Sequence, residues 1–158
     1  MITIEERLEF SLSPNALFAF LADFRTLPEW DPGIVRASLR SGTATEVGAT
    51  YDITSRFLGR DLPLVYRTRV YDADARFAEI AGVGDGVYAT DRISIAAKEG
   101  GCRLIWQADF QLRGPIKYVD ALTKPIFVQL GKKAMAGLQR RVAQGGIGET
   151  AVQPRVQA

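Results

Sequence analysis

The sequence predicts an α+β fold in which a curved seven-stranded antiparallel sheet wraps around a long C-terminal helix, with two short helices after the first strand. Two observations lead to this fold class. Apolar residues recur at every second position through six consecutive segments separated by short turns, and a long apolar stripe of helical period follows them. Because one helix cannot cover a flat sheet of seven strands, the sheet must curl, and a cavity can remain between sheet and helix.

The N-terminal elements are a strand and a helix. Residues 2–10 supply regularly placed apolar positions and predict the first strand. Ser13 followed by Pro14 is typical of a helix start, because the N–H that proline lacks would have no partner there. Residues 14–24 place apolar side chains on one stripe and predict an amphipathic helix. The segment 27–33, LPEWDPG, is expected to be a turn, since two prolines and a glycine favour turn or extended backbone.

Six strands are expected in the middle of the chain. Stretches such as GRD, DADAR and KEGG interrupt the alternation, and GVGDG at 82–86 is interpreted as a hairpin turn. Strands joined by such short connections pair as an antiparallel meander. The expected strands are 35–39, 51–57, 64–70, 76–83, 87–97 and 103–113.

The last element is a helix that is expected to run from about residue 114 to residue 143. Pro125 lies inside this stretch and should kink it or divide it into a short entry helix and a long main one. Residues 144–158 lack a periodic apolar pattern and are expected to be a flexible tail, which leaves residues 1–143 as one domain. The apolar stripe of the helix consists of Phe127, Leu130, Ala134, Leu138 and Val142.

Composition excludes several classes of protein. A net charge of +2 without a basic block makes nucleic acid an unexpected partner. The chain has no histidine, which removes Ser-His-Asp and Cys-His catalysis and most zinc or iron sites, so we expect no metal and no cofactor. Its one cysteine, Cys102, has no basic activator nearby. Without a secretion signal or an apolar run of about 20 residues, the protein is expected in the cytoplasm, without stable membrane insertion, as a monomer or homodimer.

Strand parity predicts which side chains face the cavity, if the more apolar side of each strand is taken as the inward one. On residues 87–97 this side is apolar except for Asp91. Two interpretations of Asp91 stay open. Either it faces the cavity, where burial would raise its pKa, or a bulge turns it to the rim, where it pairs with an arginine. The inward residues of the other strands are Tyr51, Ser55, Phe57, Leu64, Tyr66, Thr68, Trp106, Ala108 and Phe110.

Five segments occur in an order typical of one known family. They are SPNALFAFLADFRTLPEWDPGI, VGATYDI, ATDRISI, GGCRLIWQADFQLRG and PIFVQLGKKAMAGLQRRV. This order resembles the START-like helix-grip superfamily, specifically its polyketide cyclase/dehydrase and lipid transport group, SRPBCC, over residues 1 to about 143. The resemblance implies the helix-grip fold with an internal cavity. It also implies that Trp30 borders the cavity entrance, although the indole could equally well pack the small helices onto the sheet.

The main functional prediction is a protein that binds or carries a small hydrophobic ligand, aromatic, polycyclic or lipid-like, in its cavity. The alternative is a cyclase or dehydratase in which Asp91 takes a proton beside a carbonyl while Tyr66 or Tyr51 stabilises the enolate oxygen. A third possibility is a module that interacts with proteins or membrane lipids. Asp91 and Tyr66 are the catalytic candidates. The candidate ligand-binding residues are Trp30, Tyr51, Ser55, Phe57, Tyr66, Thr68, Asp91, Trp106, Phe110, Phe127 and Leu130.

Overall fold

The computed structural model describes residues 1–115 and 120–148, and its seven strands form one antiparallel sheet in the order β1-β7-β6-β5-β4-β3-β2. This confirms the predicted meander of six strands. The first strand joins it at one edge, where Ile2 lies opposite Phe110 and Phe10 lies opposite Cys102. The strands are β1 (Ile2–Phe10), β2 (Ile34–Ser41), β3 (Thr50–Phe57), β4 (Arg60–Asp72), β5 (Phe77–Gly84), β6 (Val87–Lys98) and β7 (Gly101–Leu112).

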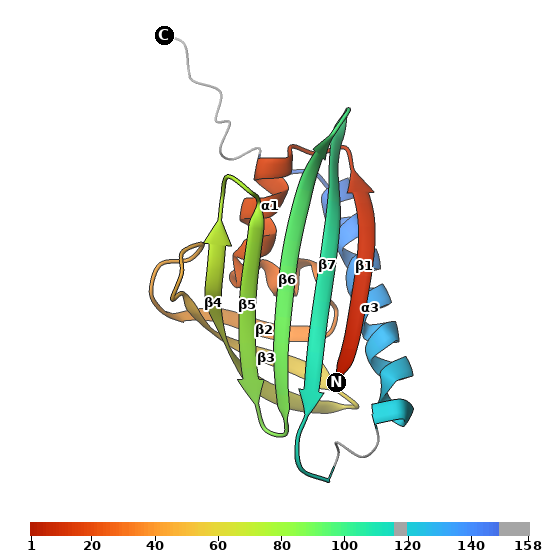
Figure 1. The fold of residues 1–158 in the computed structure, drawn as a ribbon. Coiled ribbons are helices and arrows are strands. Elements are labelled where there is room, and N and C mark those ends of the chain that lie inside the picture. Colours follow the sequence, from red (N-terminus) through yellow and green to blue (C-terminus); the bar gives the residue numbers. More distant parts are fainter. Residues whose placement is uncertain (116–119, 149–158) are drawn as a thin grey trace.

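The helices lie on one side of the curled sheet (Figure 1). Helix α1 packs on β6 and β7, while the long helix α3 packs on β1 and touches α2. Figure 1 also shows β2 and β3 turned across the direction of β5 to β7. The sheet therefore forms a concave inner face toward the helices. The helical elements are α1 (Pro14–Ala22), the 3-10 turn η1 (Phe24–Thr26), α2 (Leu27–Trp30) and α3 (Asp120–Ala143).

Register shifts accompany the bend of the sheet. The pairing of β4 with β5 shifts between Thr68 and Val70, and that of β2 with β3 shifts between Ile34 and Arg36. An extra residue on one strand of an antiparallel pair bends that strand and increases its twist. The pairings of β6 with both its neighbours run without such a shift. The centre of the sheet is therefore regular and the bulges lie toward the β2 side.

The segment after α1 corrects the sequence interpretation of residues 27–33. Leu27–Trp30 is a short helix rather than part of a turn, with Pro28 in its first turn, where a missing N–H costs nothing. The N–H of Asp31 closes it by donating to the carbonyl of Leu27 at 2.9 Å. The preceding helix begins as predicted, with the Ser13 hydroxyl accepting from the N–H of Ala16. It ends at Ala22 instead of residue 24, because Asp23 caps the next turn.

The C-terminal part differs from the prediction in its boundaries. Helix α3 begins at Asp120, and Pro125 lies in its second turn instead of dividing it. Residues 116–119, which the sequence assigns to this helix, lie outside the described residues. Of the predicted tail, Ile147 is buried and Gly148 lies against Ala16, so the chain packs beyond residue 143. Residues 149–158 lie outside the described part of the chain.

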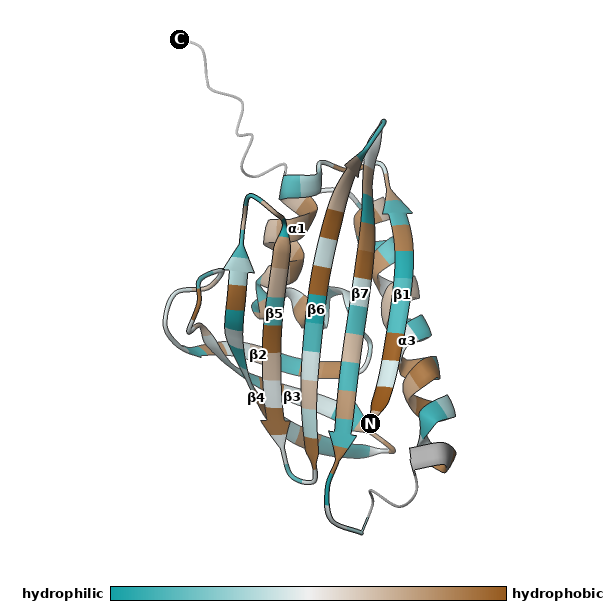
Figure 2. Cartoon of the chain, viewed as in Figure 1, coloured by the Kyte–Doolittle hydropathy of each residue, from teal (hydrophilic) through white to brown (hydrophobic). Residues whose placement is uncertain are grey.

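The core lies between the inner face of the sheet and the helices. Every second residue of β6 from Val87 to Ile95 is buried. Figure 2 shows hydrophobic and hydrophilic residues alternating along β5 to β7. The hairpin predicted at 82–86 exists, but its turn is Asp85–Gly86, and the first three residues of GVGDG belong to β5. Position 82 of β5 requires a glycine, because a Cβ would lie 2.7 Å from the Tyr66 ring, which packs over β5 from the neighbouring strand.

Candidate functional site

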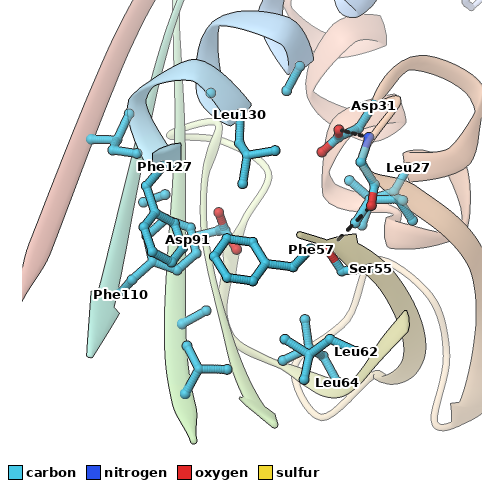
Figure 3. A pocket seen from close by; sticks show the side chains of 18 of the residues that line it. Leu27, Asp31, Ser55, Phe57, Leu62, Leu64, Asp91, Phe110, Phe127 and Leu130 are labelled. Carbon is cyan, nitrogen blue, oxygen red and sulfur yellow. Dashed lines mark hydrogen bonds between the residues drawn. The ribbon is translucent and has the colours of Figure 1, made fainter. Parts of the chain in front are cut away.

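A cavity of about 620 Å³ lies between the inner face of the sheet and the helices α2 and α3. Its walls are mostly apolar, and Figure 3 shows several of these side chains around the open space. Helix α3 closes one side and the strands β4, β6 and β7 close the opposite one. The apolar lining residues include Leu27, Ile34, Leu62, Leu64, Val87, Ala89, Ala108, Leu112, Ala134 and Met135.

The exposed lining residues indicate where the cavity opens. Leu58, Arg60 and Asp61 at the tip of the β3–β4 hairpin line the cavity and are exposed, as is Asp85 in the β5–β6 turn. Leu58 is 67% exposed and has a positive φ of 51°, a conformation that a leucine adopts at some cost. The mouth therefore lies at the ends of these two hairpins.

Three phenylalanines form an aromatic wall beside the mouth. Phe57 of β3 stacks on Phe127 of α3 with ring centroids 5.2 Å apart, and Phe110 of β7 lies 4.5 Å from the same ring. Figure 3 shows Phe57 and Leu130 reaching into the cavity from opposite elements. This wall offers flat apolar surfaces to an aromatic or polycyclic ligand.

Asp91 lies on the cavity side of β6, so the interpretation that a bulge turns it to the rim is wrong. The unbroken register of β6 keeps it among the inward residues, and only 9% of its surface is exposed. Its Oδ1 accepts a hydrogen bond of 3.0 Å from Nε1 of Trp106. Arg92, the next residue of β6, points outward and pairs with Glu79 and Asp109.

Burial raises the pKa of Asp91 to about 7. The hydrogen bond from Trp106 and the nearby Tyr66 hydroxyl oppose this effect, and the negative charge of Asp31 adds to it. For Tyr66, burial and the charge of Asp91 raise the pKa well above its ordinary value, so the phenol keeps its proton. The inner part of the cavity thus holds a carboxyl group that changes protonation near neutral pH beside a phenol that does not.

Asp31 is a cavity residue that the sequence analysis missed. It follows α2 directly, and its Oδ1 accepts from the N–H of Gly33 at 2.8 Å, a bond that fixes the side chain beside the cavity (Figure 3). Burial raises its pKa to about 6. The only sequence signal was Asp-Pro-Gly after a tryptophan, which is an ordinary turn signal.

Trp30 packs α2 onto the sheet and also lines the cavity. It is 4% exposed, lines the cavity and packs edge-to-face on Trp106 at 5.3 Å. Because the lining residues at the mouth are exposed and Trp30 is not, it lies at the inner part of the cavity instead of the entrance. Its carbonyl oxygen contacts α3 so closely that a Cβ on Gly137 would lie 1.9 Å away.

Most of the other predicted site residues also line the cavity, but two do not. Tyr51 and Thr68 are fully buried on the inner face yet lie outside the lining. Tyr51 packs against Phe24 with ring centroids 5.9 Å apart. Strand parity assigns a face, but it does not say how far along the strand the cavity extends. The predicted residues that line it are Trp30, Ser55, Phe57, Tyr66, Asp91, Trp106, Phe110, Phe127 and Leu130.

The described residues offer little basis for thiol chemistry, a metal site or a membrane-spanning helix. Cys102 is buried, and burial raises the pKa of its thiol. Within residues 1–115 and 120–148, no three Cys, Asp or Glu side chains gather as a metal site requires. None of the helices in the described part of the chain is both long and apolar enough to cross a bilayer.

Comparison with protein families decides where the chain belongs. Residues 1–145 match the model of the polyketide cyclase / dehydrase and lipid transport family. The chain belongs to this family. Membership confirms the resemblance inferred from the five sequence segments. The family and the fold fit a hydrophobic ligand-binding or a polyketide cyclase-like role and do not choose between them.

Solved structures show the same fold at low sequence identity. A protein from Thermus thermophilus has a TM-score of 0.77 and 11% identity, covering 90% of this chain and 97% of that one. The Zhui aromatase/cyclase from Streptomyces sp. R1128 has a TM-score of 0.71 and 11% identity, covering 98% and 96%. A START superfamily protein from Mycobacterium smegmatis has a TM-score of 0.68 and 14% identity, covering 89% and 93%. No curated protein sequence matches the chain.

Proposed function

We propose that this family member binds or carries a small hydrophobic molecule, aromatic, polycyclic or lipid-like, in the cavity. The observation that supports this most directly is the cavity itself, about 620 Å³ and largely apolar. Ligand pockets of roughly 300–1,000 Å³ bury most of the surface of a small molecule. We include in this proposal a cytoplasmic location, a monomeric or homodimeric state and a small molecule, not a nucleic acid, as the partner.

The arrangement of the walls suggests how the ligand lies. Phe57, Phe110 and Phe127 would contact its flat or aliphatic body near the mouth. The polar side chains Asp91, Tyr66 and Asp31 lie elsewhere in the lining and would contact a polar group. Such a division orients an amphipathic ligand with its polar end inward.

Filling the cavity should abolish binding. In Leu130→Trp, the indole would occupy the space into which Leu130 projects from α3. We expect the affinity for N-phenyl-1-naphthylamine, a neutral apolar fluorophore, to fall by about tenfold or more, because the dye loses the apolar contacts that bind it. A fluorescence titration measures this.

The matched control is Leu122→Trp, because Leu122 lies on the same helix, is 76% exposed and does not line the cavity. It should bind the dye like the unmodified protein. If the two variants bind equally well, the dye does not enter the cavity, and the proposal is wrong.

A second candidate is the cyclase or dehydratase activity, which the environment of Asp91 favours. A carboxyl group with a pKa near 7, inside an apolar cavity and beside a phenol, is suited to accept a proton next to a carbonyl. The Tyr66 hydroxyl would then stabilise the enolate oxygen by donating a hydrogen bond to it. The interaction module has less support, since the exposed apolar patch around Trp30 that it would need is absent, the indole being buried.

Turnover of a linear poly-β-ketone would distinguish the enzyme from the carrier. If Asp91 acts as the base, the rate should rise with pH through about 7, as the carboxylate forms. The Asp91→Asn variant should lose the activity by about a hundredfold or more while still binding the fluorophore. Binding without measurable turnover in the unmodified protein would reject the enzyme and leave the carrier.

A further inference from the structure

The charged side chains that line the cavity are nearly all acidic, although the chain as a whole has a net charge of +2. Five carboxylates and one arginine take part in the lining. Arg60, the arginine, is exposed at the mouth. The acidic lining residues are Glu6, Asp31, Asp61, Asp85 and Asp91. A ligand in this cavity therefore enters a negative environment.

The carboxyl groups of Asp91 and Asp31, whose pKa values burial raises, have no cationic partner among the described residues. Asp91 accepts from the Trp106 indole, and Asp31 accepts from the backbone of Gly33. By contrast, Asp61 at the mouth is bound by Arg56. Buried carboxylates are normally paired, because desolvation without a partner is costly. The inner cavity thus holds two carboxyl groups that no cation among the described residues pairs with.

The groups that face Asp91 come from every element around it. Strand β4 contributes Tyr66, β7 contributes Trp106, and Asp31 follows α2. Glu6 of β1 lines the same cavity, and Asp109 acts on Asp91 from the outer face of β7, where Arg92 binds it. The side chains that α3 contributes to the lining are apolar: Phe127, Leu130, Ala134 and Met135. None of these neighbours supplies a positive charge.

Aromatic rings surround the carboxyl groups. Trp30 and Trp106 pack edge-to-face, and both line the cavity together with Tyr66. The faces of such rings attract cations, most strongly those of tryptophan.

We propose that the ligand carries a cationic head, such as a protonated amine, which Asp91 and Asp31 bind between the rings of Trp30, Trp106 and Tyr66. This inference rests on the proposed binding function and names the class of ligand. The apolar body of the molecule extends toward the mouth along Phe57 and Phe127.

Three probes that share a pyrene ring and differ only in the polar group attached to it test the proposal. They are 1-pyrenemethylamine, 1-pyrenemethanol and 1-pyrenecarboxylic acid, which are cationic, neutral and anionic at pH 8. We expect the amine to bind about tenfold or more tightly than the alcohol, since hydrogen bonds to charged groups are worth about 1.5–3 kcal/mol. The acid should bind more weakly than the alcohol. Titration followed by pyrene fluorescence gives the three dissociation constants.

Two further measurements connect the preference to the named carboxyl groups. In Asp91→Asn, the ratio of amine to alcohol affinity should fall to near one, whereas Asp109→Asn, on the outer face of the neighbouring strand, should keep it. In the unmodified protein the same ratio should fall between pH 8 and pH 5, as both carboxyl groups gain protons. Because the second measurement needs no substitution, it does not depend on the folding of a variant.

The outcomes separate this inference from the proposed function. A preference for the amine that Asp91→Asn and acid both remove supports the cationic ligand. Equal binding of all three probes, or tighter binding of the alcohol or the acid, overturns the cationic ligand and leaves the hydrophobic carrier intact. Failure of every probe to bind overturns the carrier and with it this inference.

Discussion

Replacing Gly137 by alanine is expected to destabilise the protein by about 3 kcal/mol, the upper part of the range for inserting a methyl group into packed structure. The added Cβ would lie 1.9 Å from the carbonyl oxygen of Trp30 and 3.3 Å from Cδ of Pro32. The nearer contact is backbone and cannot move by a change of rotamer, so α2 and α3 must separate. The gain of about 1 kcal/mol from the helix propensity of alanine is too small to offset this cost. Urea unfolding measures the loss.

Gly131→Ala is the matched control on the same helix. There the nearest atom to the added Cβ is the side-chain methyl Cγ2 of Ile4 at 3.2 Å, which can shift by a few tenths of an ångström. We expect a change of less than about 1 kcal/mol. If Gly137→Ala were as stable as Gly131→Ala, the close contact between α2 and α3 would not exist in solution.

Asp91→Asn is expected to be more stable than the unmodified protein by about 4 kcal/mol at pH 8 and to equal it near pH 4. Burial raises the pKa of Asp91 from 3.8 to about 7, so between these values the folded protein binds the proton more tightly than the unfolded chain does. Unfolding then releases a proton, and stability falls as the pH rises through this window. Each pKa unit corresponds to about 1.4 kcal/mol, and asparagine avoids the cost because it carries no charge.

Comparing each variant with the unmodified protein at the same pH separates the contribution of one carboxyl group from those of the others. Asp109→Asn should be less stable than the unmodified protein at neutral pH, the opposite of Asp91→Asn. Although burial opposes it, the hydrogen bonds from Arg92 and Thr3 hold the pKa of Asp109 below its ordinary value, so its carboxylate stabilises the fold at neutral pH. Urea unfolding at pH 4.5, 6 and 8 measures both variants. A constant difference for Asp91→Asn across this range would contradict a buried, unpaired carboxylate.

The fold and one face of the site could be predicted because they follow from periodicity. The alternation on β6 placed Asp91 among apolar residues, and the alternative of a bulge failed because β6 keeps its register against both neighbours. Bulges elsewhere, such as that between Thr68 and Val70, leave no comparable sequence pattern. The inward face was thus predictable, but the places where the sheet bends were not.

Features that depend on contacts between distant residues could not be predicted. Asp31 lies in a turn by its sequence, and only the packing of α2 under α3 brings its carboxyl group to the cavity. Tyr51 has the correct parity but packs against Phe24, because η1 covers that end of the sheet. Pro125 lies in the second turn of α3, so the N–H that it lacks removes only the helical hydrogen bond to a carbonyl of the first turn.

The pairing of β1 with β7 has a consequence for how the protein folds. Ile2 pairs with Phe110, and β1 packs against α3. During synthesis, Phe110 and α3 therefore emerge from the ribosome more than one hundred residues after Ile2. Contacts of such large sequence separation give a high contact order, which slows folding because a long loop must close before the contact forms. Until β7 and α3 have been made, the apolar side chains of β1 lack these partners and are open to chaperones and to aggregation.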